Sequence, residues 1–255
     1  MKEIYFDHFP SFAELWGVVV RKLYSEIGFS EELISFLKLN KQSKIADVAA
    51  GEGFPALYLR KGGFTIDCFD LSDDQIELFK LNALKEGVDS TIIKSSWLDL
   101  KSKTGKQYEF IMCRGNSFIY ASGGWNSTEY DSKSALKLYE QTLRVFHNLL
   151  AEGGILYLDK FKDGEIDHNE KVCDVNIGSK IYSLIFQTKL YKSKKERYAS
   201  MILRDIEGNE KVFPNLTYSL SEKELRETAN KVGFSLRKTL FRTDRLFDIF
   251  ALKKR

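Results

Sequence analysis

The chain has 255 residues, of which 43% are hydrophobic and 29% are charged. That length can bury a core in one large domain, or in one domain with a small insertion. The 3 prolines and 17 glycines exclude collagen-like and low-complexity chains. With 39 basic and 36 acidic side chains the net charge is only +3, which argues against nucleic acid or a membrane surface as the main partner.

No stretch reaches the roughly 18 apolar residues of a membrane-spanning helix, and residues 1–10 mix acidic and aromatic side chains. We therefore expect a cytoplasmic protein. Cys68, Cys113 and Cys173 lie far apart and are odd in number, which favours free thiols in a reducing compartment. No metal site is expected, because the chain does not cluster metal-ligating side chains.

Short β-branched runs alternate with helical patterns from about residue 30 to residue 162, which predicts an α/β fold around a mostly parallel sheet. Strands are expected over 44–49, 64–69, 90–95, 108–113 and 155–161. Helices are expected over 31–38, 54–61, 73–86 and 132–150. Pro55 suits an early helical position, Ser72 suits an N-cap, and Gly153–Gly154 suits a turn before the last strand.

The pattern changes between residues 163 and 213, where polar and apolar residues alternate in runs joined by turn-like segments. This predicts an antiparallel β meander inserted into the main domain. After it, residues 221–233 have the pattern of a capped helix, and 235–241 and 246–254 that of two strands that pair antiparallel.

The first 30 residues carry an apolar stripe at helical spacing, formed by Phe12, Leu15, Trp16, Val19, Val20 and Leu23. A helix that covers the site and ordinary core packing explain this stripe equally well. We therefore divide the chain into an N-terminal helical lid (1–30), a main domain (31–162 and 214–255) and a β insertion (163–213) that caps the substrate site.

The sharpest signal is DVAAGEG, the turn from Asp47 to Gly53 between a predicted strand and a predicted helix. Asp70 follows Gly51 by 19 residues and ends the second predicted strand. Open α/β sheets bind ligands at the carboxyl ends of their strands. Glycines let a ligand approach the backbone, and a carboxylate accepts hydrogen bonds from both hydroxyls of a ribose, so the sequence predicts an adenosine-containing cofactor.

Residues 51–56, GEGFPA, also fit the dinucleotide pattern GxGxxA, which leaves a nicotinamide-dependent oxidoreductase as an alternative. Asp47 and Glu52 argue against it, because carboxylates beside a glycine turn repel the oxygens of a pyrophosphate. The same acids suit a cofactor that carries an ammonium and a sulfonium. S-adenosylmethionine carries both.

Five segments carry a resemblance to a known family: IADVAAGEG, CFDLSDDQI, SSWLDL, CRGNSF and GGILYLDK. On these motifs the chain resembles the class I S-adenosylmethionine-dependent methyltransferases, and among them the glycine and sarcosine N-methyltransferases. The resemblance implies a Rossmann-like seven-stranded sheet that ends in a C-terminal antiparallel hairpin. It also implies an enzyme that methylates the nitrogen of a small amino acid, amine or related metabolite and releases S-adenosylhomocysteine.

By the same resemblance, Gly51 and Gly53 line the methionyl part of the cofactor, Asp70 holds the ribose, and Trp97 offers a flat wall to the adenine. Ser96 stands where the family has asparagine, which weakens the case for its hydrogen bond to the adenine. The full set of expected cofactor-binding residues is Trp16, Asp47, Ala49, Gly51, Gly53, Asp70, Leu71, Ser96, Trp97, Leu98, Cys113 and Gly115.

Methyl transfer to an amine is an in-line displacement, so the protein mainly aligns the reactants and excludes water, and no metal is needed. The expected catalytic residues are Asn116, Arg114 and Tyr120. Asn116 offers an oxygen that holds a neutral amine. Arg114 stands where the family is apolar, and it either binds a carboxylate of substrate or cofactor or pairs with a neighbouring acid. Tyr120 stands where the family has histidine.

Phe161 occupies the position at which the family carries an arginine for a substrate carboxylate. In a strand, its neighbours Lys160 and Lys162 face a different direction from Phe161, so neither replaces that arginine. This argues against glycine as the substrate. An aromatic pocket for a methylated or cationic amine is an alternative. The residues available for it are Tyr5, Tyr120, Trp125, Tyr130, Tyr182 and Tyr218.

The loop over residues 121–131 is long, polar and glycine-containing, as expected of a mobile lid. Five basic residues lie at the predicted tip of the insertion: Lys189, Lys192, Lys194, Lys195 and Arg197. We prefer to interpret them as a solvated turn, and an RNA-binding surface is the alternative. We expect a small-molecule acceptor, no nucleic acid and no membrane, with an oxygen or sulfur acceptor as the alternative to nitrogen.

Overall fold

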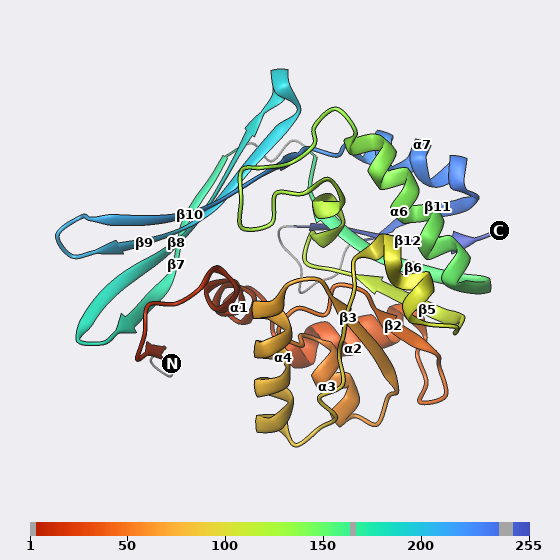
Figure 1. Ribbon diagram of the computed structural model, residues 1–255, viewed down its shortest axis with the longest axis horizontal. Coiled ribbons are helices and arrows are strands. Elements are labelled where there is room, and N and C mark those ends of the chain that lie inside the picture. The colour runs from red at the N-terminus through yellow and green to blue at the C-terminus, as the bar shows by residue number, and fades with distance from the viewer. Residues whose placement is uncertain (1–3, 164–166, 240–246) are drawn as a thin grey trace.

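The computed structural model describes residues 4–163, 167–239 and 247–255. These residues form two β-sheets and the helices that cover them (Figure 1). The larger sheet has seven strands, in the order β11 (Phe234–Thr239), β12 (Phe247–Lys254), β6 (Leu150–Phe161), β5 (Tyr108–Cys113), β2 (Ile45–Asp47), β3 (Ile66–Asp70) and β4 (Ile93–Lys94). No helix in the described part of the chain is long and apolar enough to cross a membrane.

Strand directions in the larger sheet agree with the sequence pattern. From β6 through β5, β2 and β3 to β4 the strands run parallel, and β12 pairs antiparallel with both β6 and β11. The predicted parallel sheet closed by a C-terminal antiparallel pair is confirmed. Residues 240–241 and 246 of that predicted pair lie outside the described residues.

Helices cover both faces of this sheet, because successive residues of a buried strand face opposite sides. Ile45 packs with one group of helices and its neighbour Ala46 with the other. The first group is α1 (Phe12–Leu23), α2 (Glu26–Leu37), α3 (Ala56–Lys61) and α4 (Asp73–Glu86), and the second is α5 (Leu100–Lys103), α6 (Ala135–Leu149) and α7 (Glu222–Val232).

Several element boundaries differ from the sequence-based prediction for local reasons. Helix α2 begins at Glu26 and not at residue 31, because the Ser25 side chain caps it. Strand β4 contains only two residues. Gly153 and Gly154 lie inside β6 and not in a turn, and the register of β6 against β5 shifts in that region. The predicted cap of α4 by Ser72 is present, since its side chain accepts the Gln75 N–H.

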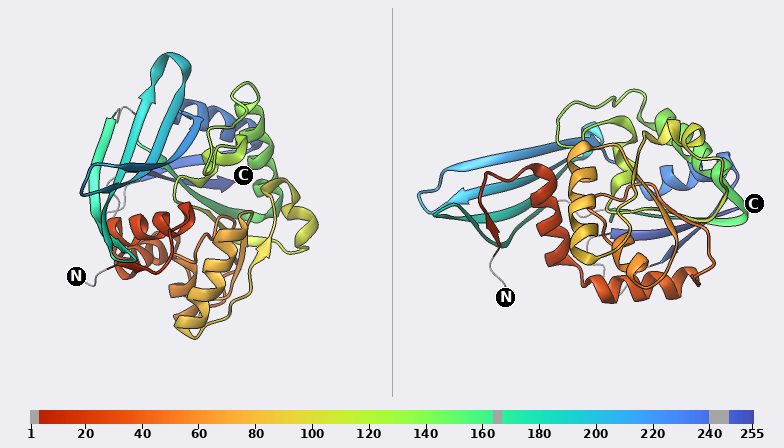
Figure 2. Two further views of the ribbon diagram at one scale, coloured as in Figure 1. Left: turned by 60° about the vertical axis from the view of Figure 1, so that its left-hand side comes forward. Right: turned by 60° about the horizontal axis from the view of Figure 1, so that its bottom comes forward.

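The smaller sheet stands beside the larger one (Figure 2). Its strands are β1 (Tyr5–Phe6), β7 (Asp167–Ile177), β8 (Lys180–Tyr191), β9 (Glu196–Asp205) and β10 (Glu210–Tyr218). Strands β7 to β10 form the predicted antiparallel meander, which continues to Tyr218 and not only to residue 213. The sequence did not predict β1, which pairs parallel with β7 at the edge.

Helix α1 packs between the two sheets. Its apolar stripe shares one core with Val175, Leu184 and Met201 of the smaller sheet and with Tyr157 of the larger sheet. This packing brings the smaller sheet and the N-terminal helix to the same end of the main domain. The division of the chain into lid, main domain and capping insertion stays a prediction.

Candidate active site

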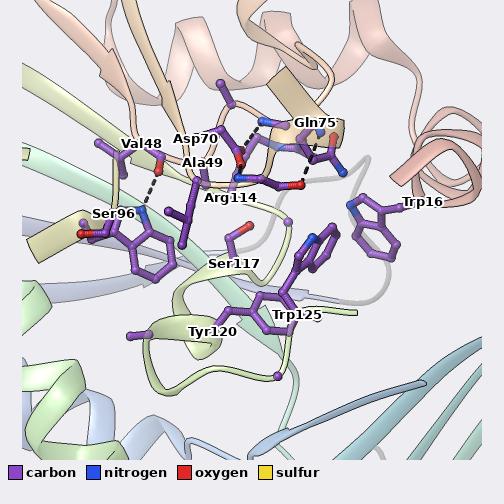
Figure 3. A pocket seen from close by; sticks show the side chains of 18 of the residues that line it. Trp16, Val48, Ala49, Asp70, Gln75, Ser96, Arg114, Ser117, Tyr120 and Trp125 are labelled. Atoms are coloured by element: carbon purple, nitrogen blue, oxygen red, sulfur yellow. Dashed lines mark hydrogen bonds between the residues drawn. The ribbon is translucent and has the colours of Figure 1, made fainter. Parts of the chain in front are cut away.

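A cavity of about 520 Å³ opens at the carboxyl ends of β2, β3 and β5 (Figure 3). Its volume is typical of sites for small molecules and cofactors. Most of the residues expected at the cofactor and the methyl group line it, namely Trp16, Ala49, Gly51, Asp70, Leu71, Ser96, Trp97, Leu98, Arg114, Gly115 and Tyr120.

The turn after β2 is held by the carboxylate that ends β3. Asp70 Oδ2 accepts a hydrogen bond from the Gly51 N–H at 2.9 Å, and Asp70 Oδ1 accepts one from the Ser72 N–H at 2.9 Å. Gly51 has a φ of +54°, a conformation that favours glycine. Burial raises the pKa of Asp70, and the backbone donors oppose that shift. The carboxylate thus fixes the turn and also lines the cavity.

One end of the cavity is a flat apolar slot. The Trp97 indole N–H donates to the Val48 carbonyl, which fixes the plane of the ring against the turn after β2. Leu71 and Leu98 line the same region and are 61% and 50% exposed, so their apolar side chains are accessible to a ligand.

Arg114 follows β5 and is a buried cation of the cavity, with only 6% of its surface exposed. Its Nη1 donates to the Phe54 carbonyl at 3.0 Å, and the guanidinium lies 4.3, 4.9 and 5.6 Å from the ring centres of Phe54, Phe29 and Tyr24. Its Nε has no hydrogen-bond partner, and it forms no ion pair with a carboxylate of the described residues. Arg114 thus has no described acid within ion-pair distance, but its charge opposes the raised pKa values of the neighbouring buried carboxyls Asp47 and Asp159.

Gln75 lines the cavity beside Gly51, and the sequence analysis missed it. It is 3% exposed, and its Oε1 is a buried acceptor without a partner. Nothing in the local sequence of α4 marks this residue, because only the packing of α4 against the glycine turn brings it to the site. Buried polar groups normally find partners, and Gln75 Oε1 and Arg114 Nε belong to two residues that line this cavity and have none at these atoms.

Three of the expected cofactor residues lie behind the cavity wall. Asp47 is fully buried, where its Oδ1 accepts the Ala49 N–H at 3.2 Å and its Oδ2 has no partner. Burial raises the pKa of Asp47 to about 7. A side chain at Gly53 would collide with Leu57, so that glycine serves the packing of α3. Cys113 is fully buried in the core.

Asn116 and Ser96 use their side chains within the protein. Asn116 Oδ1 accepts the Phe161 N–H at 3.2 Å, and the Asn116 N–H donates to Asp159 Oδ1 at 2.6 Å. Asn116 lines two small cavities behind the main one, so its oxygen joins β5 to β6 and does not face an amine in the main cavity. The Ser96 hydroxyl donates to Asp99 Oδ2 at 2.6 Å.

The Glu52 carboxylate is paired within the protein, whereas its place in the glycine turn suggested that it binds the ammonium of a cofactor. Its carboxylate is 2.7 Å from the Arg21 guanidinium of α1, and Asn82 Nδ2 donates to its backbone carbonyl at 3.0 Å. Burial raises the pKa of Glu52, and Arg21 opposes that shift. The residue therefore ties the N-terminal helix to the turn after β2.

Of the six aromatic residues considered for an acceptor pocket, Tyr120 and Trp125 line the cavity, and Trp16 joins them from α1. The remaining four, Tyr5, Tyr130, Tyr182 and Tyr218, do not line it. Their absence from the site reflects the packing of the smaller sheet and α6, which alternating polarity in the sequence does not specify.

The loop over 121–131, which its composition predicts to be a mobile lid, makes two hydrogen bonds to β10. The Leu216 N–H donates to the Ser127 carbonyl at 2.9 Å, and the Asn126 N–H donates to Asn215 Oδ1. Gly124 packs so closely on Leu216 that a Cβ there would overlap the Leu216 carbonyl oxygen. Trp125 is thus held in place by the smaller sheet.

The basic run at the tip of the insertion divides into two parts. The four lysines, Lys189, Lys192, Lys194 and Lys195, are exposed, as a solvated turn requires. Arg197 is only 5% exposed, and its guanidinium lies 4.8 Å from the ring centre of Phe161. Lys160 is also buried and donates to Asp163 and to the Phe161 carbonyl.

Sequence comparisons match about half of the chain. A family model described as "Tellurite resistance protein TehB" matches residues 19–122. The chain is 29% identical over 136 residues to a glycine/sarcosine N-methyltransferase of Halorhodospira halochloris, which covers 53% of this chain and 46% of that protein. It is 24% identical over 155 residues to the glycine N-methyltransferase of Rattus norvegicus. That match covers 58% of this chain and 50% of the rat protein. The chain thus spans about half the length of the curated relatives it matches.

Solved structures extend the similarity to nearly the whole chain. CalS10, an amino pentose methyltransferase of Micromonospora echinaspora with S-adenosylmethionine bound, aligns over 97% of this chain and 100% of its own, with a TM-score of 0.69 at 13% identity. The chain has the class I methyltransferase fold. The sugar N-methyltransferase KedS8 of a Streptoalloteichus species shares this methyltransferase fold, with a TM-score of 0.67 at 14% identity over 100% and 97% of the two chains. The resemblance inferred from the five motifs is confirmed.

The raised pKa of Asp47 predicts a pH dependence of stability. Between pH 3.8 and about 7 the folded carboxyl keeps its proton while the unfolded one releases it, so the free energy of unfolding should fall as the pH rises through this window. The part due to Asp47 should be on the order of 4 kcal/mol. The free energy of unfolding of Asp47→Asn should therefore fall by about that much less than that of wild type, and it keeps the smaller fall due to the raised pKa values of Asp70, Glu52 and Asp159. Urea titrations at several pH values measure both falls.

Asp74→Asn, which replaces an exposed carboxyl on α4, is the control for that measurement and should follow the wild-type slope. An Asp47→Asn variant whose stability falls as steeply as that of wild type would contradict the assignment.

Proposed function

We propose that the chain is an S-adenosylmethionine-dependent methyltransferase that acts on the nitrogen of a small molecule. One observation carries this: a single cavity at the strand ends is lined by Trp97, by the Asp70 carboxylate and by the buried Arg114, whose Nε has no hydrogen-bond partner. The curated relatives are named as glycine and glycine/sarcosine N-methyltransferases, and KedS8 as a sugar N-methyltransferase, which supports nitrogen as the acceptor atom.

The lining of the cavity fits the parts of this cofactor in order. The Trp97 ring suits the adenine, and the Asp70 carboxylate suits the ribose hydroxyls. The two buried groups without partners suit the amino-acid end, because Arg114 Nε donates to a carboxylate and Gln75 Oε1 accepts from an ammonium. The glycine turn at Gly51 leaves room for the ligand between these groups.

S-adenosylmethionine supplies a methyl group on a sulfonium. The residues of this chain align the acceptor with it and exclude water, since the transfer itself requires no further catalyst group. Trp16 and Trp125 wall the cavity at the end away from Trp97. Burial raises the pKa of Tyr120, so it stays a neutral phenol whose oxygen accepts a hydrogen bond from an uncharged amine. Tyr120 thereby takes the role that the sequence suggested for Asn116.

Nitrogen is preferred to oxygen or sulfur on the chemistry of the cavity. A neutral amine attacks without a base, whereas a hydroxyl must lose its proton in the reaction. Among the described residues that line the cavity there is no histidine and no lysine to take that proton. Two of the three lining acids, Asp70 and Glu52, are engaged by backbone N–H groups and by Arg21, which leaves Glu129 as the one carboxylate of the described lining that an oxygen or sulfur acceptor could use as a base.

The Asp70→Ala variant tests the cofactor assignment. It removes the charge-assisted hydrogen bonds to the ribose, worth about 1.5–3 kcal/mol, so the affinity for S-adenosylhomocysteine should fall by roughly tenfold or more. Calorimetry on the folded variant measures this change. Asp174→Ala removes an exposed carboxylate of β7 and should bind like wild type. Wild-type protein that does not bind S-adenosylhomocysteine, or equal affinity in Asp70→Ala, would contradict the proposal.

The Arg114→Leu variant tests which carboxylate Arg114 holds. If it holds that of the cofactor, the variant should bind S-adenosylhomocysteine roughly tenfold or more weakly, because a charge-assisted contact is lost. It should bind 5′-methylthioadenosine, which lacks the amino-acid end, as well as wild type does. Calorimetric titration of both ligands into both proteins separates the two effects.

Equal losses for both ligands would mean that Arg114 supports the fold of the cavity. Unchanged affinity for both would leave the carboxylate of an acceptor as its partner.

A further inference from the structure

Three aromatic rings form one end of the cavity, which we call the aromatic corner: Trp16 from α1, Tyr120 from the 3₁₀ turn η2 (Ser117–Ser122), and Trp125. The Trp125 ring centre lies 5.2 Å from that of Tyr120, with the planes at 76°, and 6.4 Å from that of Trp16, with the planes at 86°. Figure 3 shows the three side chains gathered on the side of the cavity opposite Ser96. Rings at nearly right angles wall one shared space.

Contacts within the protein hold the rings of the aromatic corner in place. Trp125 is fixed by the hydrogen bonds of its loop to β10 and by the Phe12 ring, whose centre lies 4.6 Å away with the planes at 89°. Trp16 lies on α1, which packs between the two sheets. A site whose walls are already ordered does not lose conformational entropy when the ligand enters.

The charges around the cavity favour a cation in this space. Its described lining residues include the acids Asp70 and Glu129 against Arg114 as a base, while the charge of the third lining acid, Glu52, is paired with Arg21. The faces of tryptophan and tyrosine attract cations through their quadrupole, and the attraction is strongest where water is excluded.

Among the described residues that line the cavity, Arg114 is the only cation available to a carboxylate. The buried cations Lys160 and Arg197 line a separate small cavity, and Lys160 is paired there with Asp163. Arg114 lies against the Phe54 carbonyl, beside the glycine turn that suits the cofactor.

We propose that the aromatic corner binds a methylated ammonium group, so that the acceptor is an alkylamine recognised through its cationic head and not an amino acid held by its carboxylate. This proposal rests on the methyltransferase function proposed above, and it names the acceptor class of that same site.

The transfer step explains why such a corner suits both reactants and product. An acceptor bound as an alkylammonium first releases one proton to solvent, because only the neutral amine has a lone pair. That lone pair forms a bond to the methyl carbon while the carbon–sulfur bond breaks, and the sulfur keeps the electron pair of the broken bond as a thioether. The positive charge passes from sulfur to nitrogen, and a primary or secondary amine then releases a proton to solvent. The aromatic faces therefore lie near the sulfonium charge before the transfer and near the ammonium charge after it.

Tetramethylammonium is the probe for this site, and tert-butanol is its uncharged counterpart of similar shape. The wild-type protein is first saturated with S-adenosylhomocysteine, which carries no sulfonium, and each probe is then titrated by calorimetry. We expect tetramethylammonium to bind at least tenfold more tightly than tert-butanol. Trp125→Leu should weaken tetramethylammonium binding by roughly tenfold or more.

Tyr182→Leu is the matched control, because Tyr182 is an aromatic residue of the smaller sheet that packs on Phe9 outside the cavity. It should bind tetramethylammonium as wild type does. Tyr120→Leu serves as the second variant if Trp125→Leu fails to bind S-adenosylhomocysteine.

Equal affinities for the two probes, or unchanged tetramethylammonium binding in a corner variant that still binds S-adenosylhomocysteine, would overturn the proposal. Failure of the wild-type protein to bind S-adenosylhomocysteine in the first titration would instead overturn the methyltransferase function, and this proposal with it.

Discussion

A buried row of charges across three neighbouring strands sets the geometry of the cavity. Asp47 ends β2, Arg114 follows β5, and Asp159 lies in β6, and each is at most 6% exposed. Burial raises the pKa of both carboxyls, and the charge of Arg114 opposes both shifts. The attraction acts beyond the distance of an ion pair, so the aromatic rings around Arg114 also stabilise its charge. Burial without a direct counter-ion is costly, which is why a ligand carboxylate should bind there.

Each member of this row also holds a loop that lines the cavity. Asp47 accepts a hydrogen bond from the turn after β2, Asp159 accepts one from the Asn116 N–H, and Arg114 donates to the Phe54 carbonyl. The loops after β2 and β5 are therefore ordered by groups that belong to the core of the sheet. Such preorganisation matters for methyl transfer, because the protein contributes mainly by aligning two reactants in a site without water.

The sequence revealed those features that depend on near neighbours or on the rules of parallel sheets. Gly51 and Asp70 were predictable as partners, because the carboxyl ends of adjacent strands meet at one edge. Asn116, Arg197 and Trp125 were not, since their surroundings come from β6, from the Phe161 ring and from β10, all distant in the chain. Strand β1 was not predictable for the same reason, because it pairs with β7, which lies far away in the sequence. Composition also did not reveal the hydrogen bonds that join the loop over 121–131 to β10.

The central claim is that this cavity transfers a methyl group from S-adenosylmethionine to an amine without a carboxylate. It is tested most directly by the release of S-adenosylhomocysteine when the wild-type protein and S-adenosylmethionine are incubated with single acceptors: a mono- or dimethylated alkylamine, glycine, a phenol and a thiol. The account predicts release with the alkylamines above the rate without acceptor, and no such increase with glycine. Release that no acceptor stimulates, or that only glycine, the phenol or the thiol stimulates, would contradict it.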